Sequence, residues 1–384
     1  MRKFNYIFLL MTIAMSAQVA KAQGDSVSVK LVTFYPGNEV FSIYGHSEVR
    51  VTWQDNDWYF NYGVFDFNEP GFVMRFVLGN ADYLCVAMPQ NYAMHGMDGR
   101  RMVEQELNLT QQQAVKVKDF LINNVQPENC KYRYQYLGDN CATRPRDIIE
   151  MAVGDSLMYP AMTDTVTYRD MMSHYSRNYP WNQFGVDLVL GADLDKPLTY
   201  RQQMFIPMVL MNAVGGATTM RDGVKVPLVS NTQVLIDGSE DGIVEGPTPW
   251  FLTPLAAALV LLTVVIAITI KDLRSHRVTR WLDFGICTVY SMAGLIIFFL
   301  MFVSVREATF PNYNALWVNP FYLLPIMFMW SERTRKALKC YYAANAAVIA
   351  CTMLAWPFLP QVANVAFFPL MIVPVLRALP HLAR

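Results

Sequence analysis

Residues Phe251 to Ile270 read FLTPLAAALVLLTVVIAITI and decide the architecture of the chain, because this stretch contains no charged side chain. About 20 apolar residues in a helix are enough to cross a bilayer. Further apolar stretches follow it, so the sequence predicts an all-α bundle of about five transmembrane helices. We place these helices at residues 251–270, 281–303, 316–330, 340–358 and 365–378.

The composition of the whole chain supports a membrane protein. Among 384 residues, 31 Lys and Arg balance 31 Asp and Glu, so the net charge is zero. A nucleic-acid partner is not expected, because neutralising phosphates requires an excess of basic residues. Charged residues make up 16% of the chain, against about 25% in soluble domains. The hydrophobic share of 53% also excludes a disordered chain.

The N-terminus has the pattern of a secretory signal. A positively charged start, an apolar segment over residues 6–15 and the sequence Ala20-Lys-Ala22 predict a signal peptide at residues 1–22. An uncleaved signal anchor is the alternative. Residues 23–245 then form an exported domain, and residues 246–384 form the membrane domain.

Basic residues in the short loops predict the orientation of the helices. Lys and Arg gather in residues 271–280, in residues 333–339 and in the C-terminal tail, whereas the opposite loops carry only Arg306. Such residues stay on the cytoplasmic side of a membrane. We therefore expect a multi-pass protein of the inner membrane with residues 23–245 in the periplasm.

The exported domain has the pattern of an α+β fold with an antiparallel sheet. Alternating apolar residues predict its strands, and Asn56-Asp57 is the expected turn between the second and third strands. Thr110 and Gln113 have the spacing of a capping box at the start of a helix. We place strands at residues 28–35, 48–53 and 58–67, and helices at residues 109–123 and 144–153.

Cys141 is the candidate nucleophile of the exported domain. It lies in the sequence Asp139-Asn-Cys-Ala-Thr-Arg-Pro-Arg-Asp147, just before a predicted helix. A helix N-terminus and the nearby Arg144 and Arg146 should lower the pKa of the thiol and favour the thiolate. A structural cysteine is the alternative interpretation.

The other cysteines have less specific roles. Cys85 and Cys130 are also exported, so the exported domain has an odd number of thiols. A disulfide between these two is one possibility, which the sequence leaves open. Three further cysteines lie in or beside the membrane helices, where a small apolar side chain is the simplest interpretation; these are Cys287, Cys340 and Cys351.

His46 is the candidate general base, since a cysteine nucleophile needs one. The other exported histidines, His95 and His174, have the pattern of surface residues. His46 stands in Tyr44-Gly-His-Ser-Glu48 at the start of a predicted strand, although a core histidine would have the same pattern. Asn61, on the next strand, is placed to orient the imidazole, and a locally satisfied strand residue is its alternative.

Several kinds of site are not expected. The sequence has no HxxxH or CxxC spacing, so a zinc site is improbable and no metal is predicted. It also lacks GxSxG, Walker and GxGxxG patterns, so no nucleotide cofactor is predicted.

Several motifs together resemble the Lnb family, the lipoprotein N-acyltransferases of Bacteroidetes. The resemblance covers nearly the whole chain, and the order of the GH and DNC motifs is its most specific part. In the exported part the motifs are Phe41–Ser47, Asn61–Phe67, Gly99-Arg100, Leu107–Thr110, Asp139–Arg144 and the later Trp181, Gly185, Asp187 and Gly191. In the membrane part they are Phe310–Asn314 and Leu316–Pro320.

The resemblance implies a permuted papain-like domain of the NlpC/LRAT type, with the histidine before the cysteine in the chain. It makes Cys141 the nucleophile and His46 the base, and we add Asn61 as the third catalytic residue from its strand position. The expected substrate-binding residues are Tyr44, Tyr62, Asn140 and Arg144.

The reaction that the resemblance implies has two steps. An acyl chain passes from a phospholipid donor to the cysteine as a thioester, and then to the α-amine of a diacylated lipoprotein. No cofactor is expected. Two other functions remain open at this point: a membrane-tethered cysteine peptidase or amidase that acts on peptidoglycan, and a non-catalytic membrane adaptor.

Overall fold

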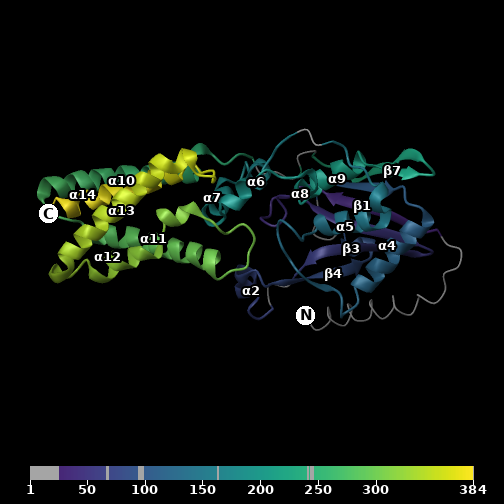
Figure 1. Ribbon diagram of the computed structural model, residues 1–384, viewed down its shortest axis with the longest axis horizontal. Coiled ribbons are helices and arrows are strands. Elements are labelled where there is room, and N and C mark those ends of the chain that lie inside the picture. Colours follow the sequence, from purple (N-terminus) through teal and green to yellow (C-terminus); the bar gives the residue numbers. More distant parts are fainter. Residues whose placement is uncertain are drawn as a thin grey trace. The chain divides into compact units, whose positions relative to one another are not determined.

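The computed structural model describes residues 26–65, 69–93, 99–161, 164–239, 242 and 246–383. The predicted signal peptide lies outside the described residues. The chain divides into two compact units (Figure 1). The first contains Met1–Thr165 and Leu198–Glu245, and the second contains Val166–Pro197 and Gly246–Arg384. Residues 166–197, which the sequence analysis places in the exported domain, thus pack with the C-terminal unit.

A seven-stranded antiparallel sheet forms the centre of the first unit, which confirms the predicted α+β class. Its strands follow the order β6-β4-β3-β2-β1-β5-β9, and a separate hairpin pairs β7 with β8. The bounds are β1 Ser28–Phe34, β2 His46–Trp53, β3 Asn56–Val64, β4 Asp82–Met88, β5 Met102–Leu107, β6 Lys131–Arg133, β7 Thr218–Arg221, β8 Val224–Pro227 and β9 Val229–Ile236.

The turn between β2 and β3 differs from the prediction. Trp53 pairs with Asn56, so the two turn residues are Gln54 and Asp55, and Asn56-Asp57 already belongs to β3. Gln54 takes the left-handed conformation with φ 52°. Because the side chains of a strand alternate between faces, it is the pairing register, and not the turn propensity of Asn and Asp, that fixes this hairpin.

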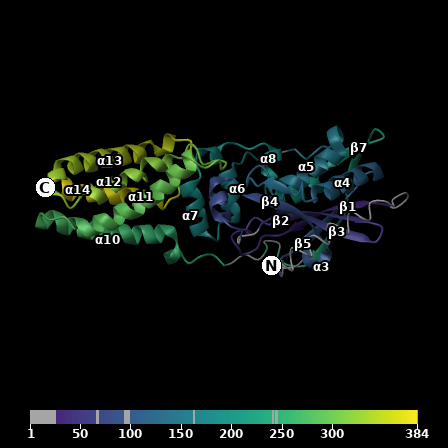
Figure 2. The same ribbon diagram turned by 90° about the horizontal axis from the view of Figure 1, so that it is seen from below.

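Three helices of the first unit bury one face of the sheet. The helices α4, α5 and α9 lie against the strands on the same side, as the view in Figure 2 shows for α4 and α5. The predicted capping box is confirmed, because Thr110 and Gln113 bond reciprocally at the start of α4. The helices of this unit are α2 Phe72–Leu78, α3 Gln90–Ala93, α4 Gln111–Asn124, α5 Thr143–Val153, α8 Tyr200–Gln203 and α9 Pro207–Gly215.

The second unit is helical. Three of its described segments are long and apolar enough to cross a membrane by length and composition: Pro254–Ser275, Arg280–Phe302 and Glu332–Phe358. A fourth apolar helix, Phe367–Leu382, is shorter. The helices are α6 Tyr168–Tyr175, α7 Pro180–Val189, α10 Pro254–Ser275, α11 Arg280–Phe302, α12 Leu323–Phe328, α13 Arg335–Ala355 and α14 Phe367–Leu382.

The predicted third membrane helix, residues 316–330, is not a continuous helix. A 3-10 turn at Pro320–Tyr322 leads into α12, which has only six residues. Pro320 and Pro325 lie in these short elements and lack the N–H group that a longer helix would need. The third predicted membrane segment is therefore built from short helical elements.

A cluster of polar contacts around Arg169 and Asp187 joins residues 166–197 to the rest of the second unit. Its guanidinium contacts Asp187 at 2.6 Å and Asp195 at 2.8 Å. Asp187 also accepts a hydrogen bond of 2.8 Å from the amide of Asn364, and its backbone carbonyl accepts one of 2.9 Å from Asn314. All three charged side chains of this cluster are buried or nearly so, and the paired charges satisfy one another.

Candidate active site

The start of α5 fixes the position of Cys141. The side-chain oxygen of Asn140 accepts hydrogen bonds from the backbone N–H groups of Ala142 and Thr143, at 2.8 and 2.9 Å. Its amide nitrogen donates to the backbone carbonyls of Tyr136 and Phe205. Asn140 therefore holds the turn that leads into α5. Cys141 is left at the positive end of the helix dipole, which favours a thiolate.

The first residue of β2 places the base beside this helix. The Nε2 atom of His46 lies 3.0 Å from the side-chain oxygen of Asn61 and 3.6 Å from Oε1 of Glu48. Asn61 on β3 stands directly opposite Glu48 on β2 in the register of the sheet. The side chains of His46 and Cys141 are close enough for each to shift the pKa of the other. The structure thus brings together the three predicted catalytic residues.

The electrostatics of the pair favour a thiolate and an imidazolium. Burial alone would lower the pKa of His46, but the attraction of the Cys141 thiolate and the nearby Glu48 raise that pKa to about 10. Burial alone would raise the pKa of Cys141. The imidazolium of His46 and the backbone N–H groups of Ser47 and of Cys141 itself outweigh burial and lower it. The resulting ion pair is the resting state of a reactive thiol.

Glu48 is a member of the site that the sequence analysis missed. Its side chain is fully buried, and in the described part of the chain neither carboxylate oxygen has a hydrogen-bond partner. Oε1 of Glu48 lies 3.6 Å from Nε2 of the His46 imidazole. The signal was available, since His46 and Glu48 are two residues apart on one strand and therefore share a face.

Arg100 is a second charged neighbour of the site. Its Nε donates to the backbone carbonyl of Tyr35 at 2.7 Å. Burial lowers the pKa of Arg100 to about 10, although the negative charges of Cys141 and Glu48 oppose this shift. Arg100, the second residue of the Gly99-Arg100 motif, therefore adds positive charge near the Cys141 thiolate.

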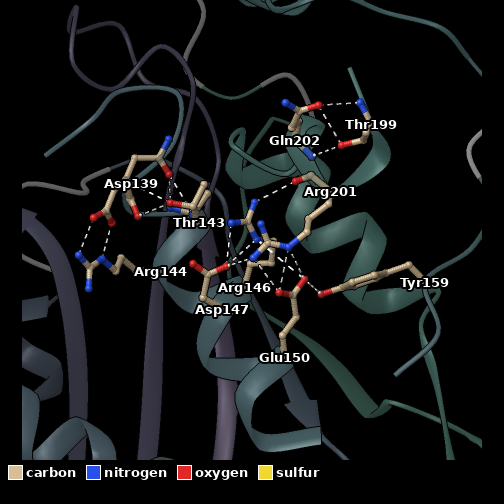
Figure 3. Close-up of polar contacts among 12 residues, drawn as sticks. Asp139, Thr143, Arg144, Arg146, Asp147, Glu150, Tyr159, Thr199, Arg201 and Gln202 are labelled. Atoms are coloured by element: carbon tan, nitrogen blue, oxygen red, sulfur yellow. Dashed lines mark hydrogen bonds and ion pairs between the residues drawn. The ribbon is translucent and has the colours of Figure 1, made fainter. Parts of the chain in front are cut away.

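The arginines that the sequence places beside Cys141 have other partners. Arg144 forms an ion pair with Asp139 (Figure 3), and its guanidinium also lies 4.4 Å from the ring centre of Tyr132. Arg146 contacts Asp147 at 2.7 Å and is buried. The pKa of Cys141 is therefore lowered by His46 and backbone N–H groups, and not by the two arginines as predicted.

The ion pairs around Arg146 join α5 to α8. Arg146 donates to the backbone carbonyl of Arg201 at 2.9 Å. The guanidinium of Arg201 in turn contacts Asp147 at 2.6 Å and Glu150 at 2.9 Å, as Figure 3 shows. This network stabilises the helix that begins two residues after Cys141.

The remaining predicted substrate-binding residues lie in different surroundings. Tyr62 is fully buried, and its hydroxyl donates to the side chain of Asn124 at 2.6 Å. Tyr44 is largely buried and meets the ring of Tyr136 edge-on, with centres 5.6 Å apart. The contacts of Tyr62 with Asn124 and of Asn140 with backbone carbonyls thus support the fold around the site.

The other exported cysteines and histidines stay apart from this chemistry. Cys85 and Cys130 are free thiols in the structure, so the possible disulfide is not formed, and burial raises the pKa of Cys85 to about 12. His174 lies in α6 of the second unit, and His95 lies outside the described residues. Among the described residues no group of three or more His, Cys, Asp or Glu is placed to hold a metal ion.

Comparison with known families assigns both parts of the chain. Residues 15–174 match the Lnb N-terminal periplasmic domain, and residues 247–384 match the Lnb transmembrane domain. The chain belongs to the Lnb family. No curated protein and no solved structure matches it. Membership of the Lnb family makes this a membrane protein with a periplasmic domain, as predicted, and the periplasmic domain carries Cys141 and His46.

Proposed function

We propose that this Lnb protein transfers an acyl chain from a phospholipid to the α-amine of a diacylated lipoprotein, with Cys141 as the nucleophile. The observation that carries the proposal is the ion pair of Cys141 and His46 at the start of α5, in a chain that also has membrane helices. We further propose that the protein lies in the inner membrane, where both lipid substrates would be present.

The first step would form a thioester. The Cys141 thiolate attacks the ester carbonyl of the donor, and the C–O bond to the glycerol breaks. The departing alkoxide takes its proton from the imidazolium of His46 and leaves as a lysophospholipid. We assign the backbone N–H groups of Ser47 and Cys141, which stabilise the thiolate, to the oxyanion of the tetrahedral intermediate.

The second step would form the amide. The amine of the S-diacylglyceryl cysteine attacks the thioester carbonyl, and neutral His46 accepts the proton that the amine loses. The C–S bond then breaks and restores the thiolate. An amine attacks a thioester more readily than an oxygen ester, which is the chemical reason for a cysteine at this position. Asn61 would hold the imidazole in place through its 3.0 Å contact with Nε2.

The experiment that tests the proposal follows the acyl group. Full-length protein is incubated with phospholipid vesicles, and Cys141 is examined by mass spectrometry for an added acyl chain. The α-amines of lipoproteins are compared in cells that contain the wild type or Cys141→Ala and lack any other such enzyme. We expect acylated amines with the wild type only, because Cys141→Ala cannot form the thioester. Triacylated lipoproteins in the Cys141→Ala cells would refute the mechanism.

A matched variant tests the need for a thiol, and the wild type separates acyl transfer from peptide hydrolysis. Cys141→Ser keeps nearly the same shape but replaces the thiol by a hydroxyl of much higher pKa, so we expect it to be inactive as well. A wild-type protein that cleaves cell-wall peptides and never acquires an acyl chain on Cys141 would replace our proposal with a peptidase.

A further inference from the structure

A row of aromatic side chains leads away from Cys141 towards α2. The row starts at Gly63, which has no side chain between the thiol and the ring of Tyr134. A Cβ atom at Gly63 would lie 3.9 Å from Cβ of Cys141 and 4.0 Å from the Tyr134 ring. Tyr134 stacks on Tyr83 with ring centres 4.2 Å apart. The row therefore begins near the nucleophile, with only Gly63 between them.

The row continues without a charged residue to the first turn of α2. The ring of Tyr83 lies 4.9 Å from that of Phe65, and Phe65 stacks on Phe72 at 5.5 Å. The ring centres of Phe72 and Phe76 lie 6.2 Å apart. Tyr83 and Phe72 are buried in the core of the first unit, whereas Phe65 and Tyr134 are half-buried. The half-buried members keep part of their side chains exposed while they pack against the core.

The helix α2 at the end of the row exposes apolar side chains. Its sequence, FVMRFVL, contains one charged residue, and it stands apart from the helices that cover the sheet (Figure 1). Val73 and Met74 are 63% and 61% exposed, and Phe76 is 39% exposed. A cluster of exposed large apolar residues in a protein that also spans a membrane favours contact with lipid over contact with water.

We infer that the row from Tyr134 to Phe76 binds the acyl chain of the donor and that Val73 and Met74 touch the lipid from which that chain is drawn. This inference rests on the proposed function, since it gives the acyl chain a place once its carbonyl is at Cys141. The occupant is a lipid hydrocarbon chain, because the row offers apolar surface and no charge. The length of the row would favour long acyl chains over short ones.

A pair of double variants tests the lipid contact. Val73→Glu/Met74→Glu adds two charges on the exposed face of α2, and Val224→Glu/Met220→Glu adds two charges on the β7–β8 hairpin, where the replaced side chains are also exposed. Cys141 acylation is measured in the full-length protein with long-chain phosphatidylethanolamine vesicles and with the soluble ester p-nitrophenyl acetate. Mass spectrometry reports both products.

The inference predicts a change in the ratio of the two acylation rates. We expect the α2 variant to lower the ratio of long-chain to short-chain acylation by about tenfold or more, because carboxylates oppose contact with hydrocarbon. The hairpin variant should keep the wild-type ratio. An unchanged ratio in the α2 variant, or an equal fall in both double variants, would overturn the inference.

A second measurement does not depend on acyl transfer. Cys141→Ala protein is irradiated with a phospholipid that carries a diazirine on its acyl chain, and the cross-linked peptides are identified. We expect cross-links in peptides that contain Tyr134, Phe65 or residues 72–78. Cross-links confined to the membrane helices would overturn the inference. If the wild type shows these cross-links but never forms a thioester, the proposed function fails and the lipid site stands.

Discussion

Replacing Glu48 by Gln should lower the pKa of His46 and narrow the pH range of the first chemical step. The substitution keeps the shape of a side chain that is fully buried but removes its negative charge. In the proposed first step, His46 must be an imidazolium to protonate the leaving lysophospholipid. The rate of thioester formation should therefore fall on the alkaline side at the pKa of His46, which stands raised to about 10 in the wild type.

The size of the effect follows from the distance between the two charges. Oε1 of Glu48 lies 3.6 Å from Nε2 of His46. At an effective dielectric constant of about 20, two unit charges at this separation attract by about 4–5 kcal/mol, equivalent to about three pKa units. Because 17% of the His46 side chain is exposed, water screens part of this attraction. We therefore expect a fall of about one to two units.

The assay is the pH profile of Cys141 acylation in the full-length protein, measured by mass spectrometry before the second step. The alkaline limb should move in Glu48→Gln from about pH 10 to about pH 8–9. Glu106→Gln removes a charge near the end of β5 that lies away from His46. This control variant should leave the profile unchanged. Thermal unfolding shows whether each variant is folded. A Glu48→Gln profile that superimposes on the wild type would refute the electrostatic role of Glu48.

Four other perturbations have defined outcomes. His46→Ala should lower the rate of thioester formation by about 10²–10⁴, with a smaller loss in Asn61→Ala because Asn61 acts through the base; rapid-quench mass spectrometry measures both. Arg169→Ala should lower the free energy of unfolding by about 3–5 kcal/mol, because it leaves two buried carboxylates without their cation. Limited proteolysis should then cut residues 166–197 first. A reporter fused after Arg277 should be active only in the cytoplasm, and periplasmic activity would reverse the proposed orientation.

Local patterns in the sequence were sufficient for much of the first unit. The capping box of Thr110 and Gln113 involves residues three apart, so it needs no knowledge of the fold. The contact between His46 and Asn61 also follows from neighbouring strands, because β2 and β3 are joined by a two-residue turn. Both features depend on short-range geometry, which alternation and turn length largely determine.

Features that depend on distant partners could not be predicted in the same way. The packing of residues 166–197 with the C-terminal helices is not visible in the sequence, because the contacts of Asp187 with Asn314 and Asn364 join positions more than 100 residues apart. The strand β9 was missed because most of its side chains are exposed at the edge of the sheet and give it no apolar alternation. Arg146 was misassigned for the same reason, since its backbone partner, Arg201, lies 55 residues away.

The coupling between Cys141 and His46 explains how one imidazole can serve both proposed steps. In the resting site, the negative charge of the Cys141 thiolate is the largest influence that raises the pKa of His46. Once the thiol carries an acyl group that charge is gone, so the pKa of His46 falls and the residue becomes a base. This change comes when the incoming amine must lose a proton. When the amide forms and the thiolate returns, the pKa of His46 rises again. The imidazole is thus an acid while it faces a thiolate and a base while it faces a thioester.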